Sequence, residues 1–207
     1  MPVIVALVGL PGSGKSSVAR QLGRAWGWPV VDTDQRLESR IGQSIRDFFS
    51  QHGEAAFRDL EAEVLTASLA EPGAFVLSTG GGIVLREENR HALKSRSQVF
   101  YLRTSVEELV SRLRSDTTRP LLQGVDPRQK LRELMAVRDP LYRSTAHYVV
   151  EARRPSVSGM SHWIQMQMEL GGHLVCAPAV ADGQSAPSTA TSANAARHEA
   201  SPPTLGV

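Results

Sequence analysis

The chain has 207 residues, of which 41% are hydrophobic and 21% charged, a composition that excludes a wholly disordered chain and a coiled coil. Its formal net charge of +2 gives no electrostatic footprint for nucleic acid, so we expect no nucleic-acid partner. A single cysteine, Cys176, excludes an intrachain disulfide and a paired-cysteine zinc or redox motif, which fits a reducing cytoplasm.

The most apolar stretch, residues 2–12, is too short to span a bilayer. It also lacks the preceding basic residue and the cleavage site that a secretory signal needs. We therefore expect a cytoplasmic protein with no membrane partner. The sequence contains no apolar stripe that would require a partner subunit, so we expect a monomer.

The composition changes near Gly171. Of the 37 residues from 171 to 207, 24 are Ala, Ser, Pro, Gly or Thr, and none is aromatic. Such a segment has too little apolar mass to offset its ordering entropy. We therefore divide the chain into a folded domain of residues 1–170 and a disordered, low-complexity tail of residues 171–207, with a docking peptide as the alternative for the tail.

Strand and helix patterns alternate through the first 170 residues. Residues 3–8 form the continuous apolar run of a strand buried on both faces. The expected elements that follow are a helix at 16–26, a strand at 29–31, helices at 34–41 and 44–70 with a break at Gly53, a strand at 74–78, a helix at 87–94, a strand at 98–102, a helix opened by a Thr104–Glu107 capping box and running to 114, a loop at 115–126, a helix at 127–143 with a possible kink at Pro140, a strand at 148–150, and a helix from Pro155 at its first position to 170. This order predicts an α/β fold with a parallel sheet covered on both faces, and ligands beyond the carboxyl ends of its strands.

Residues 9–16, with the sequence Gly-Leu-Pro-Gly-Ser-Gly-Lys-Ser, match the phosphate-loop pattern G-x-x-x-x-G-K-[ST] between a strand and a helix. Glycines let backbone N–H groups curl round phosphate oxygens, and the helix N-terminus adds a favourable field. Lys15 supplies charge toward the transferred phosphate, and the Ser16 hydroxyl can ligate Mg²⁺. The motif predicts a nucleoside-triphosphate site, against the alternative of a glycine-rich turn without a ligand.

Asp32 and Asp34 stand at the end of the second strand. In extended chain, residues two apart face the same side, so both carboxylates would point into the cleft. One would hold the metal, and the other would accept a proton from an acceptor hydroxyl. The alternative is that Asp34 only caps the following helix.

Three later segments have both a functional and a structural interpretation. Arg58 and Glu61 share a helix face, either as an arginine fork for a substrate carboxylate or as a solvated ion pair. Residues 80–82, three glycines after the third strand, allow close approach of a ligand or form a flexible linker. Arg119 lies in a polar loop that suits a charged lid or is ordinary surface, while Arg138 and Tyr142 alone indicate a surface arginine packed on an aromatic ring.

Together these motifs, in this order along residues 1–170, resemble the shikimate kinase family, small P-loop kinases of the nucleoside-monophosphate-kinase type. The resemblance implies a five-stranded parallel sheet sandwiched by helices, with a mobile lid, which agrees with the strand count above. It implies transfer of the ATP γ-phosphate to the 3-hydroxyl of shikimate, in aromatic amino acid biosynthesis, with Mg²⁺ as cofactor. The tail is a departure, since the family usually lacks one.

The resemblance also implies roles for individual residues. Catalysis would involve Lys15, Asp34 and Arg119, with Asp34 as the base. The residues that would contact ATP are Gly12, Ser13, Gly14, Lys15, Ser16, Ser17, Arg112, Arg119 and Arg153. Adenine would lie between Arg112 and the loop at residues 153–155, with Arg114 and Arg154 as competing candidates. The residues that would contact shikimate are Asp34, Arg58, Glu61, Gly80, Gly81, Gly82 and Arg138. Ser16 and Asp32 would organise the metal.

Two other functions stay open at this point. A kinase of similar build could phosphorylate another small acceptor such as gluconate, although paired arginines and the glycine turn favour a compact carboxylated ring. A nucleotide-dependent switch that hydrolyses ATP slowly is the alternative from another class. Such a switch has no need of Asp34 or of the two substrate arginines.

Overall fold

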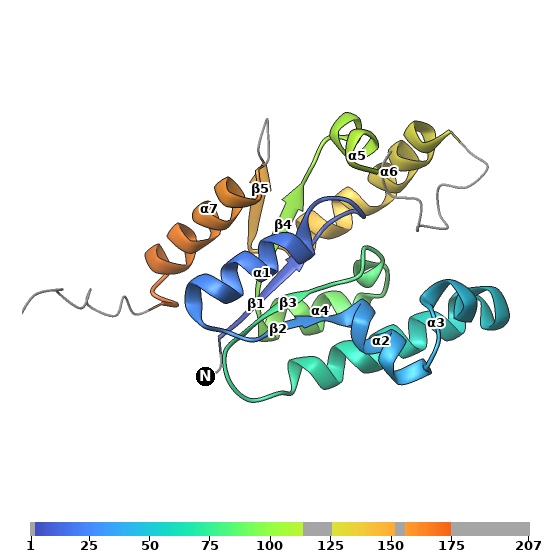
Figure 1. Ribbon diagram of the computed structural model, residues 1–207, viewed down its shortest axis with the longest axis horizontal. Helices are drawn as coiled ribbons and strands as arrows, with labels where there is room; N and C mark the ends of the chain where they lie inside the picture. The colour runs from blue at the N-terminus through green and yellow to red at the C-terminus, as the bar shows by residue number, and fades with distance from the viewer. Residues whose placement is uncertain (1–2, 114–125, 152–155, 175–207) are drawn as a thin grey trace, which may run out of the picture. The chain divides into compact units, whose positions relative to one another are not determined.

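The computed structural model describes residues 3–113, 126–151 and 156–174 of the chain. Its elements are, in chain order, β1 (Ile4–Val8), α1 (Lys15–Trp26), β2 (Val30–Asp32), α2 (Thr33–Ile41), α3 (Ile45–Leu69), β3 (Phe75–Ser78), the short 3-10 helix η1 (Ile83–Leu85), α4 (Glu87–Arg96), β4 (Gln98–Arg103), α5 (Val106–Leu113), α6 (Pro127–Thr145), β5 (Tyr148–Glu151) and α7 (Val157–Leu170) (Figure 1). The predicted alternation of strands and helices is confirmed, and the bounds differ from the predicted ones by at most two residues.

The five strands form one sheet in the order β2-β3-β1-β4-β5, and every neighbouring pair is parallel. The predicted five-stranded parallel sheet is therefore confirmed. Because all strands run the same way, the segments that follow β1, β2 and β3 leave the sheet at the same edge. The order places β3 beside β1, so the turn after β3 lies next to the loop after β1.

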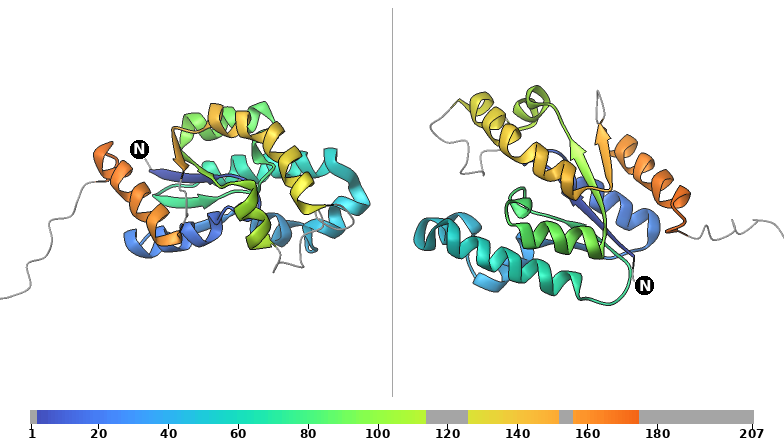
Figure 2. Two further views of the ribbon diagram at one scale, coloured as in Figure 1. Left: turned by 90° about the horizontal axis from the view of Figure 1, so that it is seen from above. Right: turned by 180° about the vertical axis from the view of Figure 1, so that it is seen from behind.

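Alternate residues of the central strands pack into two separate cores. Ile4 and Ala6 face a cluster that includes buried side chains of α3, α4 and α6, while Val5 and Leu7 face a cluster that includes those of α1 and α7. The helices thus cover both faces of the sheet (Figure 2). Burial on both sides explains why the sequence of β1 is a continuous apolar run rather than an alternating one.

Glycines shape two of the helices. Gly14, with φ 95°, precedes the first residue of α1 in the left-handed region that glycine adopts without a steric cost. Within α3, Gly53 takes the non-helical values φ 78° and ψ 178°, so the helix bends there and the predicted break is confirmed.

The predicted capping box at the start of α5 is wrong by one residue. Ser105, not Thr104, is the N-cap: its hydroxyl accepts the Glu108 N–H at 3.3 Å, and its carbonyl accepts the Leu109 N–H. The Thr104 hydroxyl is buried and has no hydrogen-bond partner among the described residues. Both positions precede a glutamate by three residues, so the sequence pattern fits either register.

Two predictions about proline are also corrected or refined. The last helix begins at Val157 with Ser156 as its N-cap, so Pro155 is not its first helical residue. Pro140 lies inside α6, as predicted, and the helix ends at Thr145, two residues beyond its predicted end. Within the ranges described above, no helix combines the length and apolarity that crossing a membrane requires.

Candidate active site

The loop after β1 wraps around its own lysine. Lys15, the first residue of α1, is 8% exposed, and its ammonium group donates hydrogen bonds to the carbonyls of Gly9 and Leu10 at 2.8 and 3.0 Å. Ser13, which belongs to the loop, is fully buried. The loop is therefore held in a closed curve, with the positive end of α1 at its centre.

Ser16, in the first turn of α1, meets Asp32 at the end of β2. The Ser16 hydroxyl donates to Asp32 Oδ2 at 3.2 Å, and it lies 3.3 Å from the Ser78 hydroxyl at the end of β3. This cluster of hydroxyl and carboxylate oxygens is the donor type that a hard divalent cation prefers. The described part of the chain holds no group of three or more His, Cys, Asp or Glu side chains arranged for a metal ion.

Asp34 does not follow Asp32 in extended chain as the sequence analysis expects. Helix α2 begins at Thr33, so Asp34 belongs to its first turn. Asp32 is the N-cap, because its Oδ1 accepts the backbone N–H groups of Asp34 and Gln35 at 3.0 and 3.4 Å. The capping role considered for Asp34 therefore belongs to Asp32, and the Asp34 carboxylate is placed by the helix instead.

Arg58 and Glu61 form a buried ion pair rather than a solvated one. Arg58 Nη1 donates to Glu61 Oε2 at 2.6 Å, and the side chains are 12% and 2% exposed. Glu54, four residues before Arg58, accepts from its Nε and Nη2 on the other side. Burial raises the pKa of the Glu61 carboxyl, and the neighbouring Arg58 opposes that rise.

The three glycines after β3 form the floor on which these groups meet. A Cβ atom built on Gly80 would lie 2.5 Å from Asp34 Oδ1, and one on Gly82 would lie 2.2 Å from Arg58 Nη1. A Cβ on Gly81 would lie 2.8 Å from the Pro11 ring of the phosphate loop. Any side chain there would displace a charged group or the loop, so residues 80–82 are a packed turn and not a flexible linker.

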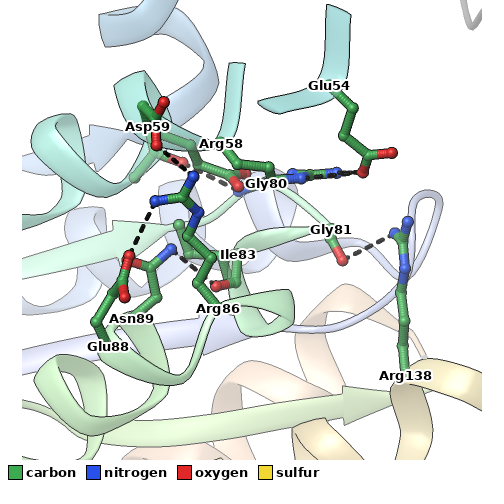
Figure 3. Close-up of polar contacts among 12 residues, drawn as sticks. Glu54, Arg58, Asp59, Gly80, Gly81, Ile83, Arg86, Glu88, Asn89 and Arg138 are labelled. Atoms are coloured by element: carbon green, nitrogen blue, oxygen red, sulfur yellow. Dashed lines mark hydrogen bonds and ion pairs between the residues drawn. The ribbon is translucent and has the colours of Figure 1, made fainter. Parts of the chain in front are cut away.

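Side chains from α2 and α6 hold this turn by its backbone. The Thr33 hydroxyl accepts the Gly80 N–H at 3.0 Å. On the opposite side, Arg138 Nη1 and the Tyr142 hydroxyl both donate to the Gly81 carbonyl (Figure 3 draws the Arg138 contact). Arg138 is 8% exposed and Tyr142 is fully buried, so the interpretation of this pair as a surface contact is wrong.

The segment beyond the turn is tied to α3 and α4. The buried Asn89 side chain donates to the Ile83 carbonyl at 3.1 Å, and Arg86 bridges Asp59 and Glu88 (Figure 3). Asp59 is the residue after Arg58, so the ion pair links α3 to Arg86, the residue that follows η1. The turn and the segment beyond it are thus held by contacts from α2, α3, α4 and α6.

Comparison with known proteins agrees with this geometry. The family model described as "Shikimate kinase" matches residues 11–168 of the chain. A shikimate kinase of Paracidovorax citrulli is 51% identical over 170 residues, which cover 81% of this chain and 93% of that protein. The chain belongs to the shikimate kinase family. A shikimate kinase of Burkholderia pseudomallei is 46% identical over 170 residues, 82% of this chain and 92% of that protein.

Solved structures of shikimate kinases share the fold. The shikimate kinase from Acinetobacter baumannii, in complex with shikimate, superimposes with a TM-score of 0.78 at 38% identity, over 84% of this chain and 97% of that one. The shikimate kinase from Aquifex aeolicus superimposes with a TM-score of 0.70 at 31% identity, over 82% of this chain and 98% of that one.

Of the arginines expected around the nucleotide of a shikimate kinase, one lies in the described structure. Arg112 on α5 donates from Nη1 to the Gly12 carbonyl at 3.4 Å and from Nη2 to Glu108 at 3.1 Å, so it reaches over the phosphate loop. Ser17 lies in the first turn of α1. Arg119 and Arg153, like the expected lid loop and residues 175–207 of the expected tail, lie outside the described residues.

The sequence analysis assigns no role in the site to three side chains that hold its parts in place, those of Glu54, Thr33 and Tyr142. Glu54 carries a signal that could have identified it, since it lies four residues from Arg58 on the same helix face. Thr33 lies between Asp32 and Asp34, the two residues for which the sequence suggests a role. Its hydroxyl accepts a hydrogen bond from Gly80, 47 residues away, which no local pattern indicates. The Tyr142 hydroxyl bonds a carbonyl 61 residues away, and no local pattern announces that contact.

Proposed function

We propose that this chain is an ATP-dependent shikimate kinase, which transfers the γ-phosphate of ATP to the 3-hydroxyl of shikimate and yields shikimate 3-phosphate and ADP. The observation that carries this proposal is the glycine turn at residues 80–82. On one side it touches the phosphate loop at Pro11, and on the other it touches Arg58, with Arg138 bonded to its carbonyl. A phosphate donor and an anionic acceptor bound at these two places would be neighbours.

The phosphate loop would bind the β- and γ-phosphates. Gly12, Ser13 and Gly14 supply backbone curvature, and Ser17 continues into the first helical turn. When ATP binds, Lys15 would exchange its hydrogen bonds with loop carbonyls for phosphate oxygens, so its charge is already at the place where it is needed. Arg112 would cover the nucleotide from α5, and Arg119 and Arg153 stay as proposed ATP contacts from the sequence.

The Ser16 hydroxyl and the Asp32 carboxylate fit Mg²⁺, because their oxygens already lie 3.2 Å apart beside the phosphate loop. Few protein ligands suffice, since Mg²⁺ keeps several waters and binds phosphate oxygens in kinase sites. When bound, the ion would neutralise negative charge on the phosphates. The capping bonds that Asp32 Oδ1 accepts leave Oδ2 directed at Ser16, so the carboxylate is held ready.

Shikimate would lie across the glycine turn. Its carboxylate would meet the guanidinium groups of Arg58 and Arg138, which come from α3 and α6. Glu61 would keep Arg58 in place, so that little ordering entropy is lost on binding. Asp34 borders Gly80 and would accept the proton of the attacking hydroxyl while the oxygen forms its bond to phosphorus and ADP leaves.

The site features and the relatives argue against the two alternatives. A nucleotide switch would have no use for a buried Arg58–Glu61 pair or for Arg138 bonded to a turn beside the phosphate loop. Against a gluconate kinase stand the relatives, since shikimate kinases are 51% and 46% identical over 170 residues of this chain.

A coupled assay of ADP release tests the proposal. Shikimate, gluconate and nucleoside monophosphates are offered one at a time at equal concentrations, with ATP and Mg²⁺. We expect release above the water background with shikimate alone. Release that depends on gluconate or on a nucleoside monophosphate, and not on shikimate, would refute the assignment.

We also propose that the protein acts in the cytoplasm as a monomer, without nucleic-acid or membrane partners. Composition supports this proposal, as described above. Light scattering coupled to size-exclusion chromatography tests the monomer, with a mass near 22.5 kDa as the expected result.

A further inference from the structure

The Gly81 carbonyl accepts two hydrogen bonds from one helix. Tyr142 of α6 is fully buried and donates its hydroxyl to that oxygen, and Arg138, one turn earlier, donates Nη1 at 3.0 Å. Burial raises the pKa of the Tyr142 hydroxyl well above its ordinary value. The hydroxyl therefore stays protonated, and remains a donor, throughout the neutral range.

This carbonyl controls more than its own position. The Gly81 C=O and the Gly82 N–H belong to one planar trans peptide and point in opposite directions, so fixing one fixes the other. Gly81 packs against Pro11 of the phosphate loop, and Gly82 packs against the Arg58 guanidinium. A rotation of this peptide would therefore push Gly82 against the acceptor arginine, whereas the phosphate loop keeps its own bonds from the Lys15 ammonium group and the Ser13 N–H.

Tyr142 is itself held firmly. Its ring stacks on Tyr101 of β4, with centroids 4.8 Å apart and an interplanar angle of 29°. The Tyr101 hydroxyl donates to Asp139 Oδ1 at 2.8 Å, and Asp139 also accepts from Arg103 and Arg143. Asp139 lies on α6 between Arg138 and Tyr142, so this network anchors the helix that carries both donors to the sheet.

We propose that Tyr142 is a positioning residue of this kinase: its buried hydroxyl orients the Gly81–Gly82 peptide and so aligns the acceptor site with the phosphate loop. The inference rests on the proposed function. Arg138 has a second task, since it is also expected to grip the acceptor carboxylate. Tyr142 can hold the turn when Arg138 shifts toward that ligand.

The test deletes one oxygen atom. Tyr142→Phe keeps the ring and its stack on Tyr101, and Tyr148→Phe is the matched control, because Tyr148 of β5 stacks on Phe100 away from the turn. For Tyr142→Phe we expect the KM for shikimate to rise by about five- to tenfold, the scale of one lost hydrogen bond. The KM for ATP should stay within about twofold, since the other loop contacts remain. A lesion that only reduced the folded fraction would lower kcat and leave both KM values unchanged.

Hydrogen exchange gives a second measurement that needs no turnover. In the ligand-free protein, the peptide covering residues 79–85 should exchange faster in Tyr142→Phe than in the wild type, and at the wild-type rate in Tyr148→Phe. Unchanged exchange together with an unchanged KM for shikimate would overturn the proposal. So would an equal rise in both KM values. If the wild type used another acceptor instead of shikimate, the proposed function would fail, and the same comparison would be read with that acceptor.

Discussion

Glu61 is an ionisable side chain that the fold places almost out of reach of water. Only 2% of this side chain is exposed, with Arg58 bonded to one of its oxygens and Asp34 nearby. Burial is the largest influence and raises its pKa above the ordinary 4.5, while the Arg58 charge opposes the rise. The folded protein therefore holds this proton to a higher pH than the unfolded chain does. The stability that this provides is fully present below pH 4.5 and is lost as the pH rises through the folded pKa.

Glu61→Gln removes this titration. We expect the free energy of unfolding of the variant minus that of the wild type to increase as the pH rises from about 4 to about 7, because only the wild type loses stability over this range. Urea unfolding at several pH values measures the difference. Glu63→Gln, on the exposed side of the same helix, is the control for the loss of a carboxylate that is not buried. A difference that falls with rising pH would mean that the ion pair with Arg58 outweighs the burial.

Lys15 is a second single residue whose replacement can be tested. Unlike the change at Glu61, its replacement should lower turnover rather than alter the pH dependence of stability. Lys15→Ala would remove the charge that we propose acts on the transferred phosphate, and loss of one such preorganised group costs on the order of 10²–10³ in turnover. The coupled ADP assay measures this, and Lys130→Ala, a surface change on α6, provides the control. Phosphoryl transfer within a factor of about two of the wild-type rate would show that the loop does not bind phosphate as proposed.

The two arginines proposed to bind the acceptor carboxylate come from different helices, Arg58 from α3 and Arg138 from α6, and they differ in the charges around them. Arg58 already forms ion pairs with Glu54 and Glu61. Across residues 3–113, 126–151 and 156–174, Arg138 forms no ion pair with a carboxylate, and its contact is the neutral Gly81 carbonyl. If both arginines bind the acceptor as proposed, we expect the positive charge that attracts it to come chiefly from Arg138 of α6.

This asymmetry predicts unequal losses. Arg138→Ala should raise the KM for shikimate by about a hundredfold and Arg58→Ala by about tenfold, with the KM for ATP nearly unchanged in both. Lysine at either position should restore part of the loss, because an ammonium group cannot make the two-pronged contact. Steady-state kinetics with each substrate varied in turn decide the order. A larger rise in the KM for shikimate at Arg58 would contradict the inference that Arg138 supplies most of the attracting charge. A large loss of ATP binding would show that both arginines belong to the nucleotide site instead.

The elements themselves were predictable where local chemistry decides them. The buried run of β1, the phosphate loop and the break at Gly53 are all visible in the sequence. Helix starts were less secure, because neighbouring residues compete for the same cap: Asp32 took the role considered for Asp34, and Ser105 took that of Thr104. Each is a shift of one or two residues that a local pattern cannot resolve.

Burial of the site was not predictable from local pattern, because it depends on the whole molecule. Arg138 and Tyr142 look like a surface pair on their own helix. The strand order β2-β3-β1-β4-β5 brings the turn after β3 beside the loop after β1, and α6 then covers the turn. A motif of a few residues does not reveal the order of the strands in the sheet. Only the resemblance to a family therefore suggested that the loop after β1, the turn after β3 and α6 form one site.

The extent of the folded domain is also a property of the whole molecule. The sequence places its boundary after Leu170, but the chain continues to make contacts beyond α7. The His173 N–H donates to the Met168 carbonyl, and Leu174 packs against the core that α1 and α7 form with the sheet. We therefore propose that the folded domain extends to about Leu174, and that the low-complexity tail expected from the composition begins after it.

Two truncations test this boundary. Removal of residues 175–207 should change the thermal midpoint by less than about 2 °C and leave turnover with shikimate unchanged, because the composition of that segment gives it little apolar mass. Removal of residues 171–207 should lower the midpoint by several degrees, since the Leu174 contact and the closing bond of α7 are lost with it. Scanning fluorimetry of both proteins beside the full chain makes the comparison. A fall of many degrees already in the shorter truncation would mean that the tail docks on the domain, and equal midpoints for the two truncations would return the boundary to Leu170.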